Sequence, residues 1–550
     1  MPPRQIDKRT LFKSAAALAA GGLATGLSGG AQAQAAPDIA AGPFQPTWQS
    51  LAGGYQAPEW FRDAKFGLWA HWGPQCAPED GDWYARQMYM QGKGQNDHHL
   101  KHYGHPADSG FIDILPTWKA EKFDPEALLD LYKKAGAKYF MALANHHDNF
   151  DTYNSKFNPW NATRIGPKRD IIGLFAKAAR SRGLKFGVSN HSAHAWHWLQ
   201  TAYGYDLEGP RQGERYDAFK LTKAMGAGKW WDGLDPQELY AGRVMAMPDG
   251  LSTIADANQW HGMNDRVWDE YPPIANPAFV RRWYLRTKDL IDSYQPDLIY
   301  FDNFDLPLGQ TGLDIAAHYY NSSIQWHGKL EAVLNIKAVV PQHRAAIVED
   351  VERGFRAGIE PHPWQTDTCI GEWHYSRKIY EKNGYKSAAA VIHRLCDVVS
   401  KNGNLLLSIP VRSDGSIDEK ETAIVEGVAS WMGRFAEAIH GTRPWKIAAE
   451  GPTHLASGQF GETGGDPFTA ADIRFTTKAG ALYAMTMGRP DSPTLSLTSL
   501  AHAKVARVEV VGSKAPLAFK QDDKGLHITL PPHASHDYGV ALKIIGKGIV

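Results

Sequence analysis

The segment FDPEALLDLYKKAGAKYFMALANHH, residues 123–147, holds one complete transition from helix to strand. Asp124 can cap a helix whose first position is Pro125, and apolar residues then recur on one helical face. The residues that follow, 138–147, have the composition of a strand. We therefore predict a helix followed directly by a strand, which is the repeating unit of α/β folds.

The same alternation continues along most of the chain. Helical segments such as 170–183 and 386–401 separate most of the predicted strands. The strands are predicted at 65–73, 138–147, 184–192, 297–303, 330–337, 345–352, 364–370 and 402–411. Eight such repeats predict an α/β fold of the (β/α)8, TIM-like barrel type. An open doubly wound sheet is the alternative, but no Gly-rich phosphate loop follows the first strand.

The composition of the chain changes on both sides of this region. Residues 1–35 have a basic start, an apolar run and small residues, which predicts an export signal peptide resembling the twin-arginine type. We expect the catalytic barrel over 36–445, with an insertion at about 200–275 that is either a lid or an outer decoration. Short alternating runs over 446–550 predict a C-terminal β-sandwich. The protein is then periplasmic or secreted.

Charge and cysteine content exclude several classes of function. Lys and Arg number 59, as do Asp and Glu, so the chain has no net charge and no basic excess for nucleic acid or an anionic membrane. No segment has the length and apolar character of a membrane span. The cysteines Cys76, Cys369 and Cys396 are too few for a disulfide framework and form no CxxC pair. The oligomeric state is not specified by the sequence.

Polar side chains recur where the predicted strands end. In a (β/α)8 barrel these ends meet on one rim, where catalysis takes place. The polar side chains at the predicted strand ends are His71 after the first strand, His146 and His147 after the second, His191 after the third, Asp302 after the fourth and Glu352 after the sixth. A single histidine at a strand end is usually structural, but six polar groups on one rim favour a functional site. Asp302 follows an apolar run, so burial requires it to have partners.

Clustered histidines leave a metal site as an alternative. Metal-dependent hydrolases on this fold commonly carry His-x-His at the end of strand one, whereas His71 is followed by Trp72 and has no such partner. His146 and His147 can face one pocket only if their strand ends between them. The histidine-rich segment 96–106 is expected in a surface or lid element. A metal-dependent hydrolase and a non-catalytic carbohydrate-binding protein are the alternative functions.

A series of motifs in order covers the barrel from about 58 to 440. They are AKFGLWAHWGPQ, GDWYARQMY, the 123–162 segment, PDLIYFDN, PWQTDTCIGEWHY and VSKNGNLLLSIPVRSDGSID. Together they resemble glycoside hydrolase family 29, the α-L-fucosidases. The resemblance implies an exo-acting, retaining enzyme without metal or cofactor. Its substrate would be a fucosylated oligosaccharide or glycoconjugate, cleaved through a covalent fucosyl-enzyme.

The resemblance also implies roles for individual residues. The aspartate that ends strand four is the family's nucleophile, which corresponds to Asp302. Its acid/base is a glutamate near the end of strand six, for which Glu352 is favoured over Glu360 and Glu349. The residues expected to bind the sugar are His71, Trp83, His146, His147, His191 and Trp373. His191 stands where many relatives carry tyrosine.

Overall fold

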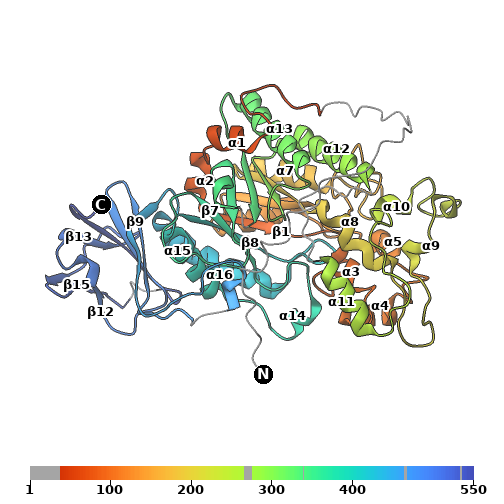
Figure 1. The fold of residues 1–550 in the computed structure, drawn as a ribbon. Coiled ribbons are helices and arrows are strands. Elements are labelled where there is room, and N and C mark those ends of the chain that lie inside the picture. The colour runs from red at the N-terminus through yellow and green to blue at the C-terminus, as the bar shows by residue number, and fades with distance from the viewer. Residues whose placement is uncertain (1–36, 266–275, 338–339, 464–466, 533–535) are drawn as a thin grey trace, which may run out of the picture. The chain divides into compact units, whose positions relative to one another are not determined.

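Eight parallel strands close into a barrel in the computed structural model of this protein (Figure 1). The strands are β1 Phe66–Ala70, β2 Tyr139–Asn145, β3 Lys185–Asn190, β4 Leu298–Phe301, β5 Val333–Lys337, β6 Val348–Asp350, β7 Trp364–Cys369 and β8 Gly403–Ser408. Each strand pairs with the next in the chain, and β8 pairs with β1. The predicted barrel is confirmed, and the open doubly wound sheet is wrong.

The structure describes residues 37–265, 276–337, 340–463, 467–532 and 536–550. The predicted export signal at 1–35 lies outside these residues. Within them, no helix is both long enough and apolar enough to cross a membrane.

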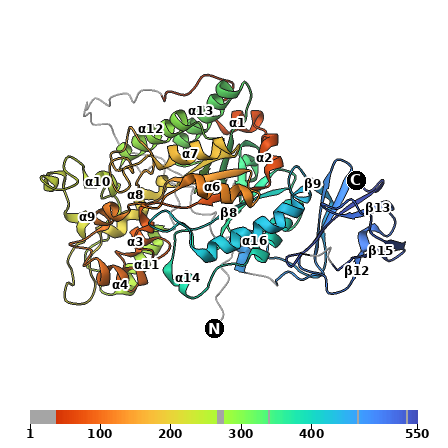
Figure 2. The same cartoon turned by 180° about the vertical axis from the view of Figure 1, so that it is seen from behind.

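Helices connect the strands and surround the barrel (Figure 2). The longer ones are α6 Pro125–Lys134, α7 Ile171–Ser181, α11 Ile254–Asp265, α12 Pro277–Tyr294, α13 Gln310–His327, α15 Ala388–Ser400 and α16 Glu419–Phe435. The shorter ones are α1 Trp48–Gly54, α2 Glu59–Ala64, α3 Tyr84–Gln87, α4 Gly94–His102, α5 Phe111–Ile114, α8 Ala195–Trp198, α9 Asp217–Lys220, α10 Pro236–Leu239 and α14 Arg377–Glu381. Helix α6 begins as predicted, because the Asp124 carboxylate accepts hydrogen bonds from the backbone N–H groups of Glu126 and Ala127.

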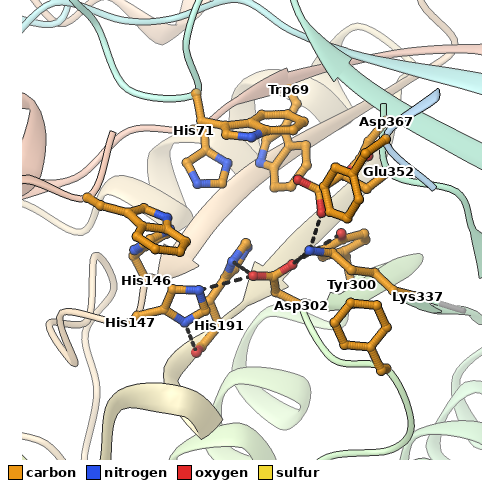
Figure 3. Close-up of a pocket in the computed structure, with 14 residues that line it drawn as sticks. Trp69, His71, His146, His147, His191, Tyr300, Asp302, Lys337, Glu352 and Asp367 are labelled. Carbon is orange, nitrogen blue, oxygen red and sulfur yellow. Dashed lines mark hydrogen bonds and ion pairs between the residues drawn. The ribbon is translucent and has the colours of Figure 1, made fainter. Parts of the chain in front are cut away.

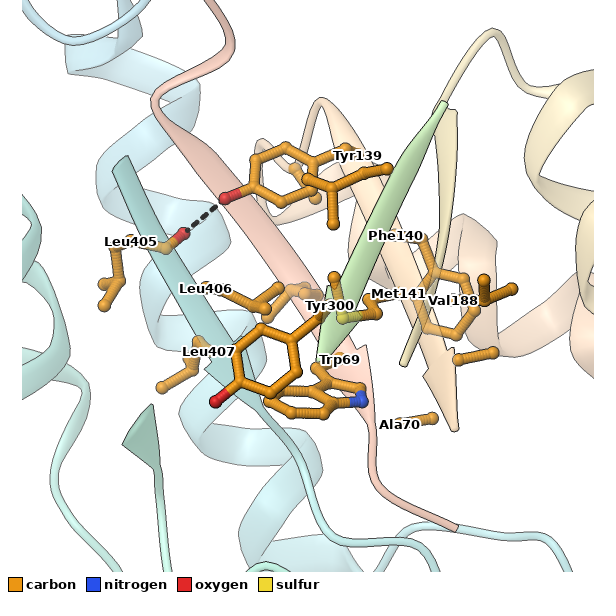
Figure 4. Packing of buried hydrophobic residues seen from close by; sticks show 14 of the residues in the cluster. Trp69, Ala70, Tyr139, Phe140, Met141, Val188, Tyr300, Leu405, Leu406 and Leu407 are labelled. Carbon is orange, nitrogen blue, oxygen red and sulfur yellow. Dashed lines mark hydrogen bonds between the residues drawn. The ribbon is translucent and has the colours of Figure 1, made fainter. Parts of the chain in front are cut away.

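Side chains fill the barrel interior (Figure 4). The Tyr139 hydroxyl reaches across the interior and donates to Gln365 Oε1 at 3.0 Å and to the Leu405 carbonyl at 3.5 Å. Gly67 makes this possible, because a Cβ at that position would lie 2.3 Å from the Tyr139 ring. The interior is therefore a packed core below the site rather than a channel.

Two antiparallel sheets follow the barrel. One has the strand order β13-β16-β11-β10-β9 and the other β12-β15-β14. Their bounds are β9 Arg443–Glu450, β10 Ile473–Lys478, β11 Ala481–Thr486, β12 Thr494–Leu497, β13 Lys504–Val510, β14 Phe519–Asp522, β15 Gly525–Thr529 and β16 Ala541–Lys547. The predicted C-terminal β domain is confirmed.

A buried ion network joins helix α15 of the barrel to strand β10. The Asp397 carboxylate, 1% exposed, pairs with Lys401 Nζ at 2.8 Å and with Arg474 Nε at 2.7 Å. Both cations are themselves buried. A buried charge is stable only when it is paired, so this carboxylate holds two cations that would otherwise lack a partner.

We predict that Asp397→Asn destabilises the protein by roughly 3 kcal/mol, because two buried cations lose their counterion. Urea unfolding followed by tryptophan fluorescence measures the change. Asp130→Asn removes the exposed carboxylate of an ion pair with Arg182, and it should cost far less, because solvent screens an exposed pair. Equal losses in the two variants would contradict a special role for the buried network.

Candidate active site

A cavity of about 310 Å³ lies at the carboxyl ends of the barrel strands (Figure 3). All eight residues that the sequence analysis favoured line it, namely His71, Trp83, His146, His147, His191, Asp302, Glu352 and Trp373. The remaining lining residues are Trp69, Tyr300, Phe304, Lys337, Asp367 and Phe460. The described residues of the 200–275 insertion and of the 96–106 segment line no part of it.

The histidine pair enters the cavity because strand β2 ends at Asn145. Beyond that point the chain turns, and the N–H of Asn149 donates to the carbonyl of His146 at 3.1 Å. His146 Nδ1 lies 2.7 Å from the Gln75 amide, while His147 Nδ1 lies 2.8 Å from the carbonyl of His191. The geometric condition for both imidazoles to share one pocket is therefore met.

Asp302 follows directly after strand β4 and is 7% exposed. Its Oδ2 lies 3.1 Å from His147 Nε2 and 3.3 Å from His191 Nδ1. Its Oδ1 contacts the Lys337 ammonium and accepts a hydrogen bond from the Tyr300 hydroxyl at 3.5 Å. Burial by itself raises the pKa of this carboxyl, but Lys337 and the histidines hold the pKa well below its ordinary value. Asp302 is therefore ionised at neutral pH.

Lys337 is a central residue that the sequence analysis missed. It ends strand β5, and its ammonium contacts Asp302 Oδ1 and Glu352 Oε2. Burial opposes its charge, yet the two carboxylates raise its pKa above the ordinary value, so it remains a cation. The signal was present in the sequence, because the predicted strand 330–337 ends in this lysine.

Three glutamates near strand β6 have different surroundings. Glu352, 9% exposed, faces the cavity two residues beyond the strand end, and burial followed by the Asp302 charge raises its pKa against the effect of Lys337. Glu349 pairs with Arg344 Nε at 2.9 Å and Arg356 Nη2 at 2.6 Å, and it does not line the cavity. Neither does Glu360, whose Oε1 lies 3.9 Å from Arg356 Nε.

Two further carboxyls belong to this part of the barrel. Asp367 on strand β7 lines the cavity, and Asp350 on strand β6 accepts a hydrogen bond from the Gln365 amide at 2.7 Å. Burial raises the pKa of Asp350 to about 7 and, together with the Asp350 charge, raises the pKa of Asp367 well above its ordinary value. Asp350 and Asp367 therefore hold protons more tightly than Asp302, and Asp302 ionises before either of them.

The imidazoles of the cavity are suited to binding hydroxyl groups. Burial lowers the pKa of His71 and His146 well below the ordinary value and that of His191 to about 4. A neutral imidazole offers one N–H donor and one acceptor nitrogen, which matches the dual nature of a hydroxyl. Both ring nitrogens of His71 are buried and make no hydrogen bond within the described residues.

Two groups of side chains also have the spacing of metal ligands. The groups are His71, His146 and His191, and His147, His191 and Asp302, with ligand atoms within 4.8 Å of one another. In the second group the carboxylate already faces the Lys337 ammonium and two imidazoles. A divalent cation there would be repelled by that ammonium, so the charge arrangement favours a neutral or partly positive ligand.

Aromatic rings form the remaining wall of the cavity. Trp69 and Tyr300 rise from the barrel interior, with ring centroids 5.2 Å apart. Trp83 adopts a left-handed conformation with φ of 64°, at the start of helix α3. Phe460, 53% exposed, comes from the segment after β9, and its N–H donates to the carbonyl of Glu352 at 2.8 Å. No local pattern identifies Phe460, because its position depends on a contact across more than a hundred residues.

Two family models match this chain, one over the barrel and one over the C-terminal sheets. The family model for alpha-L-fucosidase matches residues 31–437, and the model for the alpha-L-fucosidase C-terminal domain matches 466–545. Tissue alpha-L-fucosidase of Homo sapiens is 25% identical over 497 residues, covering 89% of this chain and 88% of the human protein. The enzyme of Rattus norvegicus is 26% identical over 498 residues, with the same coverage.

Solved structures share the fold. The alpha-fucosidase of Thermotoga maritima in complex with fucose has a TM-score of 0.66 at 24% identity, covering 91% of this chain and all of that one. Alpha-L-fucosidase isoenzyme 1 of Paenibacillus thiaminolyticus has a TM-score of 0.60 at 18% identity, covering 89% and 98%. With a family model that spans most of its length, this chain belongs to the alpha-L-fucosidase family of glycoside hydrolases.

Proposed function

We propose that this protein hydrolyses terminal α-L-fucose from oligosaccharides or glycoconjugates with retention of configuration, with Asp302 as nucleophile and Glu352 as acid/base. The observation that carries the proposal is the Lys337 ammonium, which contacts one oxygen of each carboxylate. It holds the two carboxyls close together, while the imidazoles of His147 and His191 contact Asp302 alone and favour its ionised form.

The separation of the two carboxyls supports retention. Two oxygens that each hydrogen-bond the same nitrogen can be no more than about 6 Å apart. Retaining glycosidases have carboxyls about 5–5.5 Å apart, whereas inverting enzymes need about 6.5–9.5 Å to admit a water molecule. The arrangement around Lys337 thus suits direct attack by Asp302 on the sugar.

The reaction then takes two steps. In the first, the Asp302 carboxylate attacks the anomeric carbon while the Glu352 carboxyl gives its proton to the glycosidic oxygen, which leaves as an alcohol. In the second, the Glu352 carboxylate takes a proton from water, whose oxygen attacks the anomeric carbon and releases Asp302. The first step requires an ionised Asp302 and a protonated Glu352. The lowered pKa of Asp302 and the raised pKa of Glu352 favour these two forms.

The rest of the cavity suits the shape of fucose. Neutral imidazoles at His71, His146 and His191 can both donate to and accept from sugar hydroxyls. Fucose carries a methyl group where most hexoses carry a hydroxymethyl, so its site needs an apolar surface as well. The aromatic wall that includes Trp69 and Tyr300 supplies one.

We predict that Asp302→Gly lowers kcat on an aryl α-L-fucoside by a factor on the order of 10³ or more, because no covalent intermediate can form. Added azide should restore turnover and yield a fucosyl azide of inverted configuration, identified by NMR. Asp305→Gly removes a half-buried carboxylate that does not line the cavity, and it should keep most of the activity. An active Asp302→Gly enzyme would refute the assignment.

The acid/base assignment separates Glu352 from Glu360. We expect Glu352→Gln to slow fucosides with poor leaving groups by about 10²–10⁴-fold, since only these need a proton on the departing oxygen. A dinitrophenyl fucoside should lose much less in its first step, measured as a burst of phenolate. Glu360→Gln is the matched control and should behave as the wild type with both substrates. The reverse pattern would transfer the role to Glu360.

Removal of Lys337 should move the pH profile. The ammonium favours the ionised forms of Asp302 and Glu352, so Lys337→Met raises both pKa values. Both limbs of the kcat/KM profile should therefore shift to higher pH, the acidic limb by about one unit or more. Lys185→Met removes a cation paired with Asp297 at the opposite end of the barrel and should leave the profile unchanged. An unchanged profile for Lys337→Met would show that Lys337 does not set these pKa values.

A further inference from the structure

A second cavity, of about 470 Å³, lies on the outer side of strand β7. Asp367 faces the first cavity, and the next residue in the strand, Thr368, therefore faces outward into the second. The opposite walls come from the start of helix α15 and from Leu455, Glu462, Pro467 and Phe468. The volume is in the range of sites for small ligands, and the walls combine apolar rings with a few polar groups.

The polar side of this cavity carries more positive than negative charge. Glu462 is contacted by Arg353 Nε at 2.9 Å, by Lys386 Nζ at 2.9 Å and by Arg394 Nη2 at 3.3 Å. Among the described side chains in this group, three cations meet one carboxylate, which leaves a net charge of +2. The nearby Asp397 does not correct the excess, because it already pairs with two other cations.

Arg394 is the residue for which this excess matters most. It is 5% exposed, and neither Nη1 nor Nη2 has a hydrogen-bond partner within the described part of the chain. Burial lowers its pKa, which means that its charge is poorly compensated where it lies. Leaving buried donors without acceptors is costly. Nη1 has no partner among the described residues, and Nη2 has only the 3.3 Å ion pair with Glu462, so the guanidinium fork can still receive the paired oxygens of a carboxylate or a sulfate group.

Two aromatic rings provide a surface beside these cations. The Arg394 guanidinium lies 4.1 Å from the centroid of the Phe355 ring, and the Arg474 guanidinium lies 4.8 Å from that of Phe468. Both phenylalanines line the cavity. A free inorganic ion would make no use of such a wall, whereas the apolar face of a sugar ring can pack on it.

We propose that this second cavity binds an acidic sugar, with its carboxylate or sulfate group held by Arg394 and Lys386 and its ring against Phe355 or Phe468. The site is distinct from the catalytic cavity, and its occupation does not require hydrolysis. Phe460 of the first cavity and Glu462 of the second are two residues apart, which limits their Cα separation to about 7 Å. An acidic glycan that carries fucose therefore suits both cavities, and this extension rests on the proposed function.

Isothermal titration of the full-length protein with D-glucuronate, galactose 6-sulfate and inorganic sulfate tests the proposal. The ionic strength is held constant, and glucose serves as the neutral control. We expect one saturable site for at least one acidic sugar and none for glucose. Binding of inorganic sulfate alone, or of no probe, would overturn the proposal. No fucoside is present, so this outcome is independent of whether the protein is a retaining fucosidase.

Two substitutions with opposite expected effects identify the site. Arg394→Gln should weaken binding of the acidic sugar at least tenfold, because it removes the buried donor fork. Glu462→Gln should strengthen it severalfold, because the competing carboxylate is lost and the net charge rises. A purely structural ion cluster would give neither change. Retained hydrolysis of an aryl fucoside checks the fold of Arg394→Gln, and Lys386→Gln, at a half-buried position, replaces it if that variant does not fold. Unchanged binding in the folded variants would overturn the assignment.

Discussion

One buried ammonium group, that of Lys337, joins the two carboxylates to which we assign the chemistry. A buried cation is tolerated only when carboxylates compensate it, and a buried carboxylate only when a cation does. Lys337 meets this requirement for Asp302 and Glu352 together. Because Asp302 also receives two imidazoles, it keeps the negative charge, whereas Glu352 has a raised pKa. The shared cation holds the two carboxyls together, and the imidazoles on one of them make their pKa values differ.

The closed barrel is what brings these three residues together. Strands β4, β5 and β6 are neighbours, and each contributes one residue from its carboxyl end. Side chains alternate along β6, so Glu349 points outward, where two arginines pair with it, and Asp350 points inward. Glu352 follows two residues beyond the strand end and lines the cavity. A shift of one residue in the register of β6 would turn Glu349 inward and Asp350 outward. The site therefore depends on the register of the sheet as much as on the identity of its residues.

The sequence predicts the barrel, the C-terminal sheets and the residues at the strand ends, because these follow from local periodicity and the geometry of parallel strands. It does not distinguish the residues that act through long-range contacts. The predicted strand 330–337 ends in Lys337, so the strand-end rule that selects Asp302 applies to this lysine as well. Asp367 lies within strand β7, where a carboxyl has no signal that separates it from a structural residue. Phe460 reaches the cavity only through tertiary structure.

The segment that carries Phe460 also connects the C-terminal part of the chain to Glu352. The N–H of Phe460 donates to the carbonyl of Glu352 and the N–H of Glu462 to that of Arg353, both at 2.8 Å. The Gln459 side-chain amide donates to the carbonyl of Asp350 at 2.9 Å. Three hydrogen bonds thus fix the backbone on both sides of the catalytic glutamate we propose. A loop that ends a three-residue strand would otherwise have few constraints on its position. Because a general acid must be positioned within about an ångström of its target, the role we propose for Glu352 makes this segment a positioning element rather than a linker.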